Sequence, residues 1–272
     1  MQHAWLAAPL ACALVGTLVL ARTRWPALVP LDRPDTGRKD HAAPMPLAGT
    51  ALLPFLLAAA PDRTCMVAVA LAGACGWLDD RRKQHGRGID WRLKAALLGA
   101  TSLLTALATV GNPAERPLAF ALAALFAFVV TNAVNFLDCM DGVCVMLSAT
   151  ILLLVEGIAS PLALAGFALA GALPWNWPRP RMFLGDSGAL AAGALVAAAC
   201  LHRAPPTYAV LLPALVPLAD FTQVVTVRLA IGHLPWVGDR RHLPHRLAAL
   251  GLPRLLVPIL LAMAAATALL AY

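Results

Sequence analysis

Aspartates stand at the ends of several long apolar stretches in this chain of 272 residues. Asp79 and Asp80 follow one stretch, Asp138 and Asp141 follow another, and Asp186 precedes a third. Ionisable groups next to lipid are costly, so they are rare there unless they have a function. Carboxylate oxygens are the ligands that Mg²⁺ prefers, and Mg²⁺ in turn binds phosphate oxygens. The pattern predicts a magnesium and phosphate site where these helix ends meet.

Asp79 and Asp80 are neighbours at the end of a predicted helix, so their side chains point about 100° apart. They therefore cannot both face one atom. We expect one of them to face a metal ion or a nucleophile while the other orients a neighbouring group. The structural alternative is a solvated helix end, in which the pair contacts Arg81 and Arg82.

The segment NAVNFLDCMDG carries a polar residue at every third position: Asn132, Asn135, Asp138 and Asp141. Residues at that spacing share one face of a helix, so the segment predicts a strip of amide and carboxylate oxygens. For Asn132 and Asn135, which lie within an apolar stretch, the alternative is hydrogen bonding between helices.

Two other aspartates have structural alternatives of their own. Asp186, in FLGDSG, could cap a helix that begins at Ser187, although a helix N-terminus is also an anion site. Asp220 lies well inside an apolar stretch, where its alternative role is a hydrogen bond between helices with Thr222 or Gln223.

The loop GDRRHLPHRL places His242, His245 and Arg246 close together, with Arg240 and Arg241 beside them. Arginine binds phosphate with two parallel hydrogen bonds and histidine can donate one, so the loop suits phosphate binding. A zinc site is disfavoured because no third histidine or cysteine ligand is near in the sequence. A basic loop on the membrane surface is the main alternative.

The composition predicts an integral membrane protein. The chain is 60% hydrophobic and 13% charged, with a mean hydropathy of +0.75, whereas a soluble domain has about a quarter charged residues. We expect an all-α fold, a polytopic helical bundle of about ten transmembrane helices that forms a single domain over residues 1–272. The expected spans are 4–21, 44–60, 65–78, 92–110, 116–135, 143–158, 161–177, 188–203, 207–230 and 253–271.

The basic residues predict the orientation of this bundle. If every expected span crosses the membrane, every second loop lies on the same side, which gives five loops on one side. These loops hold 18 of the 21 Lys and Arg residues, and the exceptions are Arg63, Arg116 and Arg203. By the positive-inside rule this side is cytoplasmic, and both termini are outside. The net charge of +7 is thus explained by topology rather than by nucleic-acid binding. The five loops are 22–43, 79–94, 136–142, 178–187 and 228–254.

Taken in order, these motifs resemble the polyprenyl-phosphate N-acetylhexosamine-1-phosphate transferases. This glycosyltransferase 4 type family includes the N-acetylglucosamine 1-phosphate transferases of surface-glycan synthesis and the phospho-N-acetylmuramoyl-pentapeptide transferase. The resemblance covers nearly the whole chain. It rests on LDRPDTGRKDHAAPMPLAG, LDD, Lys94, NAVNFLDCMDG, FLGDSG, the stretch from Asp220 to Arg228, and RRHLPHRL.

The resemblance implies a Mg²⁺-dependent reaction, with Mn²⁺ as a substitute, in the inner membrane of a bacterial cell with the site facing the cytoplasm. A polyprenyl phosphate would attack a UDP-N-acetylsugar, giving a lipid-linked pyrophosphoryl sugar and UMP, and a homodimer is an open alternative to a monomer. The metal would be held by Asp186, with Asp79 and Asp80. Catalytic roles fall to Asp79, Asp80, Asp138, Asp141, His242 and His245, and substrate-binding roles to Arg38, Lys39, His41, Lys94, Asn132, Asn135 and Arg246.

The sequence departs from the family pattern at two positions. Many relatives have glycine where this chain has Cys139, and histidine where it has Pro244. Because the surrounding residues match, we expect an active enzyme with altered sugar selectivity. The alternative function is an ion- or proton-coupled transporter, which would show paired broken helices or carboxylates near the membrane midplane. The sequence leaves the sugar and the glycan pathway open.

Overall fold

The computed structural model describes residues 3–21, 29–34, 43–203 and 208–270, and it is almost entirely helical. The all-α prediction is therefore confirmed. The α-helices are α1 (Ala7–Ala21), α2 (Leu53–Ala58), α3 (Arg63–Lys83), α4 (Trp91–Val110), α5 (Pro117–Phe136), α6 (Val143–Leu154), α7 (Leu162–Asn176), α8 (Gly185–Arg203), α9 (Leu215–Ala230), α10 (Leu243–Ala249) and α11 (Val257–Leu270). The short elements are η1 (Ala4–Leu6), β1 (Leu31–Asp32), β2 (Met45–Pro46), η2 (Gly49–Leu52) and η3 (Tyr208–Leu211).

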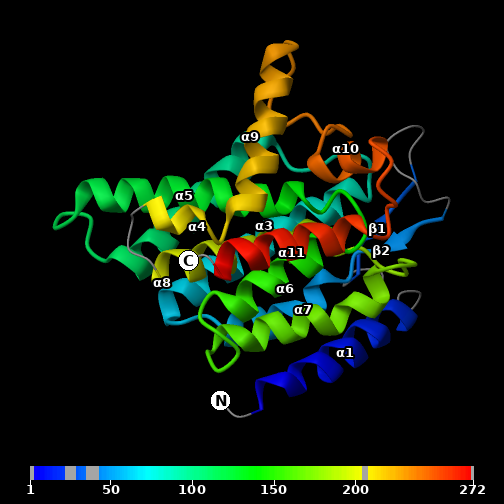
Figure 1. The fold of residues 1–272 in the computed structure, drawn as a ribbon, viewed down its shortest axis with the longest axis horizontal. Helices are drawn as coiled ribbons and strands as arrows, with labels where there is room; N and C mark the ends of the chain where they lie inside the picture. The colour runs from blue at the N-terminus through cyan, green and yellow to red at the C-terminus, as the bar shows by residue number, and fades with distance from the viewer. Residues whose placement is uncertain (1–2, 22–28, 35–42, 204–207, 271–272) are drawn as a thin grey trace.

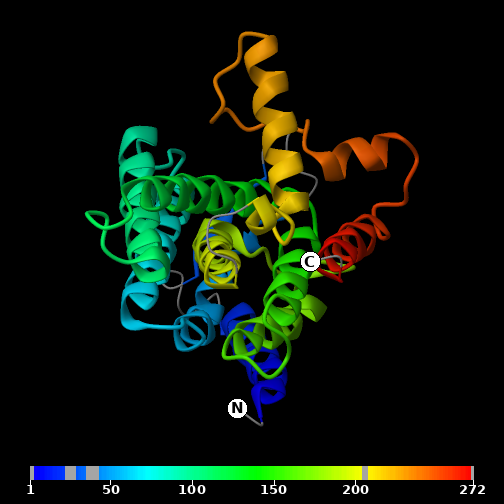
Figure 2. The same cartoon turned by 60° about the vertical axis from the view of Figure 1, so that its left-hand side comes forward.

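Most of the long helices run along one common direction, whereas α9 stands steeply across them (Figures 1 and 2). Each predicted span contains a helix, but many of these helices are short. Within the described residues, three helices are long and apolar enough to cross a membrane, namely α4, α5 and α8. Ten crossings and external termini therefore stay predictions.

Helix α8 lies at the centre of the bundle, where it contacts α3, α4, α5 and α6. It has the lowest mean hydropathy of the three long apolar helices, 1.2 against 1.6 for α4 and 2.1 for α5. Even so, 83% of its most apolar stretch of 18 residues is buried inside the protein. Its sequence is rich in alanine and glycine, which allow neighbouring backbones to approach closely. Other helices of the protein, rather than lipid, therefore surround α8.

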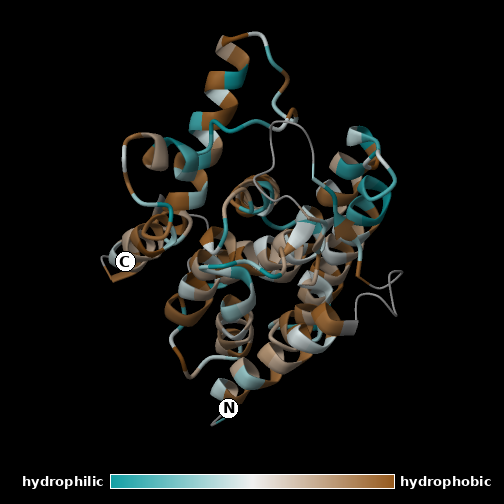
Figure 3. Ribbon diagram, turned by 90° about the vertical axis from the view of Figure 1, so that its right-hand side faces the viewer, coloured by the Kyte–Doolittle hydropathy of each residue, from teal (hydrophilic) through white to brown (hydrophobic). Residues whose placement is uncertain are grey.

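The loops predicted to share one side do meet at one end of the bundle. Strand β1 pairs antiparallel with β2, with Leu31 opposite Pro46. The chain after β2 then bonds to the segment before α8, because Ala48 N donates to Phe183 O (3.0 Å) and Phe183 N donates to Pro46 O (3.0 Å). Figure 3, which views this end of the molecule, shows hydrophilic loops gathered across it.

Candidate active site

The contact between α3 and α8 positions the first acidic residues. Gly76 faces the start of α8 so closely that a Cβ there would lie 2.2 Å from the backbone oxygen of Asp186. One turn later, Asp80 reaches the same helix end, where its two carboxylate oxygens accept the backbone N–H groups of Asp186 and Ser187, each at 3.0 Å. Asp80 therefore caps α8 from a neighbouring helix.

Asp79 and Asp80 are both buried, each with 3% exposure, and they point to different groups. Asp79 Oδ1 accepts the backbone N–H of Ile89 at 2.8 Å, and Oδ2 contacts the ammonium groups of Lys83 and Lys94, both at 2.9 Å. The prediction that the two side chains diverge is confirmed. The alternative of a solvated pair is wrong, because both carboxylates are buried although the following Arg81 and Arg82 are exposed.

Lys83 and Lys94 join Asp79 to Asp186. Lys83 Nζ lies 3.0 Å from Asp186 Oδ2, and Lys94 Nζ contacts the same oxygen. The predicted cap role of Asp186 is not what the structure shows, since Asp186 lies within the first turn of α8 and Asp80 provides the cap. The result is an alternating cluster of two carboxylates and two ammonium groups at the start of α8.

The NAVNFLDCMDG segment contributes some, but not all, of its predicted strip. Asn135 Nδ2 lies 3.4 Å from Asp186 Oδ1, and Asp138 Oδ2 accepts the backbone N–H of Gly185 at 3.0 Å. Asn132 instead donates to Phe128 O of its own helix at 2.8 Å. The Nδ2 of Asn132 is thus used within its own helix, and the role of Asn132 in substrate binding stays a prediction.

A hollow of about 1230 Å³ opens beside this cluster. Residues from all five loops predicted to share one side line it, which confirms that these loops lie together. Its lining includes Asp32, Arg33, Asp80, Lys83, Asp138, Asp141, Asp186, Arg240, His245 and Arg254. Arg38, Lys39 and His41, predicted to bind substrate, lie outside the described residues, although Asp32 and Arg33 lead into that segment.

Burial beside other carboxylates perturbs two of the acids that line the hollow. Burial, with the charge of Asp186 adding to it, raises the pKa of Asp80 to about 7. Burial and the charges of Asp186 and Asp80 raise the pKa of Asp138 to about 8. For Lys83, burial works in the opposite direction, but the neighbouring Asp186 and Asp79 raise its pKa above the usual range. Burial thus favours the protonated form of Asp80 and Asp138, whereas the lysines stabilise the charged form of the carboxylates that they contact.

The donors in this corner suit a hard cation. Within the described residues, no group of three or more His, Cys, Asp or Glu side chains is arranged to hold a metal ion. However, Asp79 and Asp186 both face positive groups in this structure, and the Asn135 amide lies beside Asp186. Carboxylate and amide oxygens fit Mg²⁺ better than a thiophilic metal.

The histidine loop divides into a buried part and a part at the hollow. His242 is 5% exposed, and its Nδ1 lies 2.9 Å from Asp220 Oδ2 while its Nε2 lies 3.3 Å from Arg228 Nη2. The prediction that His242 contacts phosphate is not supported by this placement, because Asp220 and Arg228 hold it inside the protein. His245, by contrast, lines the hollow.

Arg246 and the backbone of Arg241 contact Gln223 of α9. With its amide oriented to satisfy both partners, Gln223 donates to Arg241 O at 3.1 Å and accepts from Arg246 Nη1 at 3.0 Å. Asp220 also accepts the backbone N–H of Leu243 at the start of α10. Thr222 and Gln223 are thus not the partners of Asp220 that the sequence suggested.

Two positioning residues escaped the sequence analysis. Lys83 follows Asp79 by one helical turn, so the spacing alone could have placed the two on one face. Asn176, at the end of α7, accepts the backbone N–H of Gly142 at 2.9 Å and donates to Met182 O at 3.1 Å. It therefore ties the loop that carries Asp138 to the segment before α8, and no sequence signal pairs these positions.

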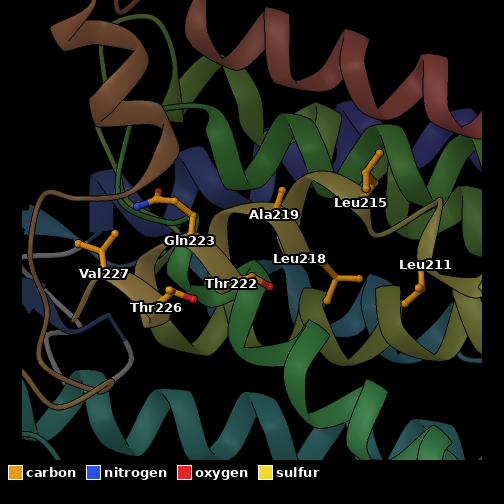
Figure 4. Close-up of a pocket in the computed structure, with 8 residues that line it drawn as sticks. All are labelled: Leu211, Leu215, Leu218, Ala219, Thr222, Gln223, Thr226 and Val227. Carbon is orange, nitrogen blue, oxygen red and sulfur yellow. The ribbon is translucent and has the colours of Figure 1, made fainter. Parts of the chain in front are cut away.

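A second hollow, of about 710 Å³, lies along the outer side of α9 and η3. Figure 4 shows its lining side chains on this one stretch of chain. They are mostly apolar: Leu211, Leu215, Leu218, Ala219, Thr222, Gln223, Thr226 and Val227. Gln223 belongs both to this hollow and to the contacts with Arg241 and Arg246, so the two features adjoin.

The part of the sequence that builds the acidic cluster matches a known protein family. A model of glycosyl transferase family 4 matches residues 63–203, just over half of the chain. The chain belongs to this family. The match begins at the first residue of α3 and ends at the last residue of α8, so it covers Asp79, Lys94, Asp138 and Asp186.

Several known proteins are similar to this chain over most of its length. The decaprenyl-phosphate N-acetylglucosaminephosphotransferase of Mycobacterium tuberculosis is 29% identical over 73% of this chain and 61% of its own length. A putative glycosyltransferase of Streptomyces coelicolor is 32% identical over 88% of this chain and 62% of its own. A phospho-N-acetylmuramoyl-pentapeptide-transferase of Synechococcus is 32% identical over 71% and 66%. The chain thus spans about three fifths of the length of the first relatives.

Proposed function

We propose that this family 4 protein transfers an N-acetylhexosamine 1-phosphate from a UDP-sugar to a polyprenyl phosphate, undecaprenyl phosphate in particular. The observation that supports this proposal most strongly is the cluster of Asp79, Lys83, Lys94 and Asp186 at the edge of the larger hollow. Alternating cations and carboxylates suit two phosphorylated substrates, which would otherwise repel each other. Two relatives support it by name, since one is a decaprenyl-phosphate N-acetylglucosaminephosphotransferase and the other is a phospho-N-acetylmuramoyl-pentapeptide-transferase.

In the proposed reaction, an oxygen of the lipid phosphate attacks the phosphorus that carries the sugar. A new P–O bond forms there, the bond from this phosphorus to the bridging oxygen breaks, and UMP leaves with the electron pair. Lys83 and Lys94 would balance the negative charge of the phosphates as they approach. Asp79 would hold both ammonium groups in place. No group has to remove a proton, because a lipid phosphate is already ionised at neutral pH.

Mg²⁺ is the cofactor of this proposal, with Asp186 as its principal ligand and Asp79 beside it. When bound, the ion would supply charge neutralisation for the transferred phosphoryl group. Asp80 would act on Asp186 through the backbone, because it caps the helix turn in which Asp186 stands. Arg240 and His245, on the other side of the hollow, are positioned to contact the remaining phosphate oxygens.

The hollow along α9 offers a surface for the lipid chain. It is lined mainly by leucine, alanine and valine side chains, and it adjoins the loop of Arg241 and Arg246 through Gln223. A polyprenyl chain placed there would keep its apolar length against α9 while its phosphate turned toward the basic loop. Leu218→Gln should therefore raise the KM for polyprenyl phosphate more than the KM for the sugar nucleotide.

The decisive experiment is UMP release by the purified protein from UDP-N-acetylsugars, with and without polyprenyl phosphate and Mg²⁺. Asp186→Asn should reduce turnover by more than about a hundredfold, since it removes a charge that contacts both lysines. Asp90→Asn is the matched control, because Asp90 caps α4 through Arg92 N and is exposed. UMP release in wild type that ignores the lipid would contradict transfer to a polyprenyl phosphate, and ion flux without UMP release would favour a transporter.

We place the site on the cytoplasmic side of the inner membrane. His85 and Arg240 are exposed residues in two loops of the hydrophilic end. Cysteines introduced at these positions, in a chain without its native cysteines, should react with an impermeant thiol reagent only after the cells are opened. Labelling of both positions in intact cells would reverse the proposed orientation.

A further inference from the structure

The segment from α9 to α10 forms a unit with its own polar network. Arg228 is 1% exposed, and its guanidinium contacts the Asp239 carboxylate through Nε at 3.1 Å and Nη2 at 3.2 Å. The same guanidinium donates to Pro235 O and reaches His242, which in turn contacts Asp220. All of these residues lie between positions 220 and 242, so the network fixes the shape of the unit without fixing its place on the bundle.

Aromatic contacts at two places join this unit to the rest of the protein. At the end of α5, the ring of Phe136 lies 5.2 Å from Phe221, 5.5 Å from His242 and 5.2 Å from the guanidinium carbon of Arg228. At the start of α4, the indole of Trp91 stacks on that of Trp236, with centroids 4.4 Å apart and planes 11° apart. Figures 1 and 2 show why such contacts matter, because α9 projects away from the bundle.

The Trp91–Trp236 stack is unlike a core contact. Trp91 is 43% exposed and Trp236 is 48% exposed, so burial alone does not account for the pair. The guanidinium carbon of Arg92 lies 5.2 Å from the Trp91 ring and adds a cation–π contact. Two large indoles placed face to face at the surface therefore form a specific link between segments far apart in the sequence.

Each of the two stacked residues stands close in the sequence to a residue of the candidate site. Trp91 precedes Lys94 by nearly one helical turn, and Lys94 contacts both Asp79 and Asp186. Trp236 precedes Asp239 by three residues, and Asp239 and its neighbour Arg240 line the larger hollow. A change in the stack would thus alter how far the Arg240 side of the hollow lies from Lys94.

We propose that the Trp91–Trp236 stack is a clasp that positions the loop of Arg240 against the lysine cluster for sugar-nucleotide binding. Neither indole is a catalytic residue in this proposal, because neither lines the hollow. The clasp rests on the proposed transferase function, in which Arg240 and Lys94 face one phosphorylated substrate. Loss of the stack would leave the protein folded but would let the 231–241 loop move away.

The test compares Trp91→Ala, Trp236→Ala, the double variant and Trp236→Phe. Each alanine variant should raise the KM for the UDP-sugar by about two- to tenfold, the range expected for one aromatic pair, and change kcat less. The double variant should be no worse than either single one, since the contact is lost only once. Trp236→Phe keeps a ring on Trp91 and should recover most of the loss.

Two further measurements separate the clasp from general damage. Trp5→Ala is the matched control, because Trp5 is 54% exposed and lies in η1, far along the chain from the site. It should leave the KM unchanged. Hydrogen exchange of residues 231–241 should be faster in Trp91→Ala than in wild type, and this readout needs no activity.

Unchanged exchange in Trp91→Ala would overturn the clasp even if the enzyme assay succeeded. Additive losses in the double variant, or a loss confined to kcat or to thermal stability, would also overturn it, because each would mean that the indoles act separately or only support folding. If wild type turned over no sugar nucleotide, the transferase proposal would fail, whereas exchange would still decide whether the two indoles hold the loop.

Discussion

Replacement of Asp80 by asparagine distinguishes a cap from a metal ligand. Both carboxylate oxygens accept backbone N–H groups of α8 at 3.0 Å, and the side chain is buried. Asparagine keeps one acceptor but turns an NH₂ group toward the second N–H. At a pH above about 7, the raised pKa of Asp80, this acceptor is charged, and the loss of one hydrogen bond to it costs about 1.5–3 kcal/mol. At about 2–4 °C per kcal/mol for a chain of this size, the melting temperature should fall by roughly 3–12 °C.

The assay is thermal unfolding of the detergent-solubilised protein in EDTA, followed by a Mg²⁺ titration. Asp62→Ala is the matched control, because Asp62 caps the other end of α3 through Cys65 N and alanine removes that acceptor. It should lower stability without lowering turnover. Asp80→Asn should lower both, since the cap also fixes the turn that carries Asp186. A metal-free melting temperature equal to wild type, with weaker Mg²⁺ dependence, would refute the cap argument.

Three other perturbations follow from the geometry of the site. Gly76→Ala should lower turnover by more than about tenfold, because its Cβ would meet the Asp186 backbone oxygen at 2.2 Å, whereas Gly99→Ala, with no atom within 4 Å, should be neutral or slightly stabilising. Asn135→Leu should impair turnover far more than Asn132→Leu, which removes only a bond to the helix's own backbone. Burial raises the pKa of Asp138 to about 8 from 3.8, so the folded protein holds a proton there that unfolding releases. The melting temperature of metal-free protein should therefore fall as the pH rises from about 5 to 8 and level off above that, and Asp138→Asn should flatten that slope in circular dichroism melts.

The sequence could predict which residues gather at one end of the bundle. Hydropathy placed helices in the right stretches, and the distribution of Lys and Arg grouped the five loops that do meet around the hollow. Helical periodicity also predicted that Asp79 and Asp80 diverge. These features depend on local spacing and on the separation of polar from apolar segments, both of which can be read along the chain.

The partner of each carboxylate could not be predicted in the same way. Asp80 reaches α8 only because Gly76 allows α3 to approach it, and that contact joins positions more than a hundred residues apart. His242 looks like a loop residue in the sequence, yet Asp220 draws it into the interior. The backbone bond of Asn132 competes with the predicted strip in a way that periodicity does not reveal. Tertiary packing decides all three.

The enclosure of α8 has a consequence for how the protein is made. A helix of hydropathy 1.2 that carries Asp186 in its first turn gains little from lipid by itself, and its small side chains leave its backbone poorly covered. Helices α3, α4, α5 and α6 precede it in the chain, so a growing polypeptide presents its partners before α8 emerges. Helix α8 can then pack into the centre of the group that α3, α4, α5 and α6 have already formed. On this order of events, the acidic cluster is completed only when α8 enters, and a chain interrupted before residue 185 would carry Asp79 and Lys94 without Asp186.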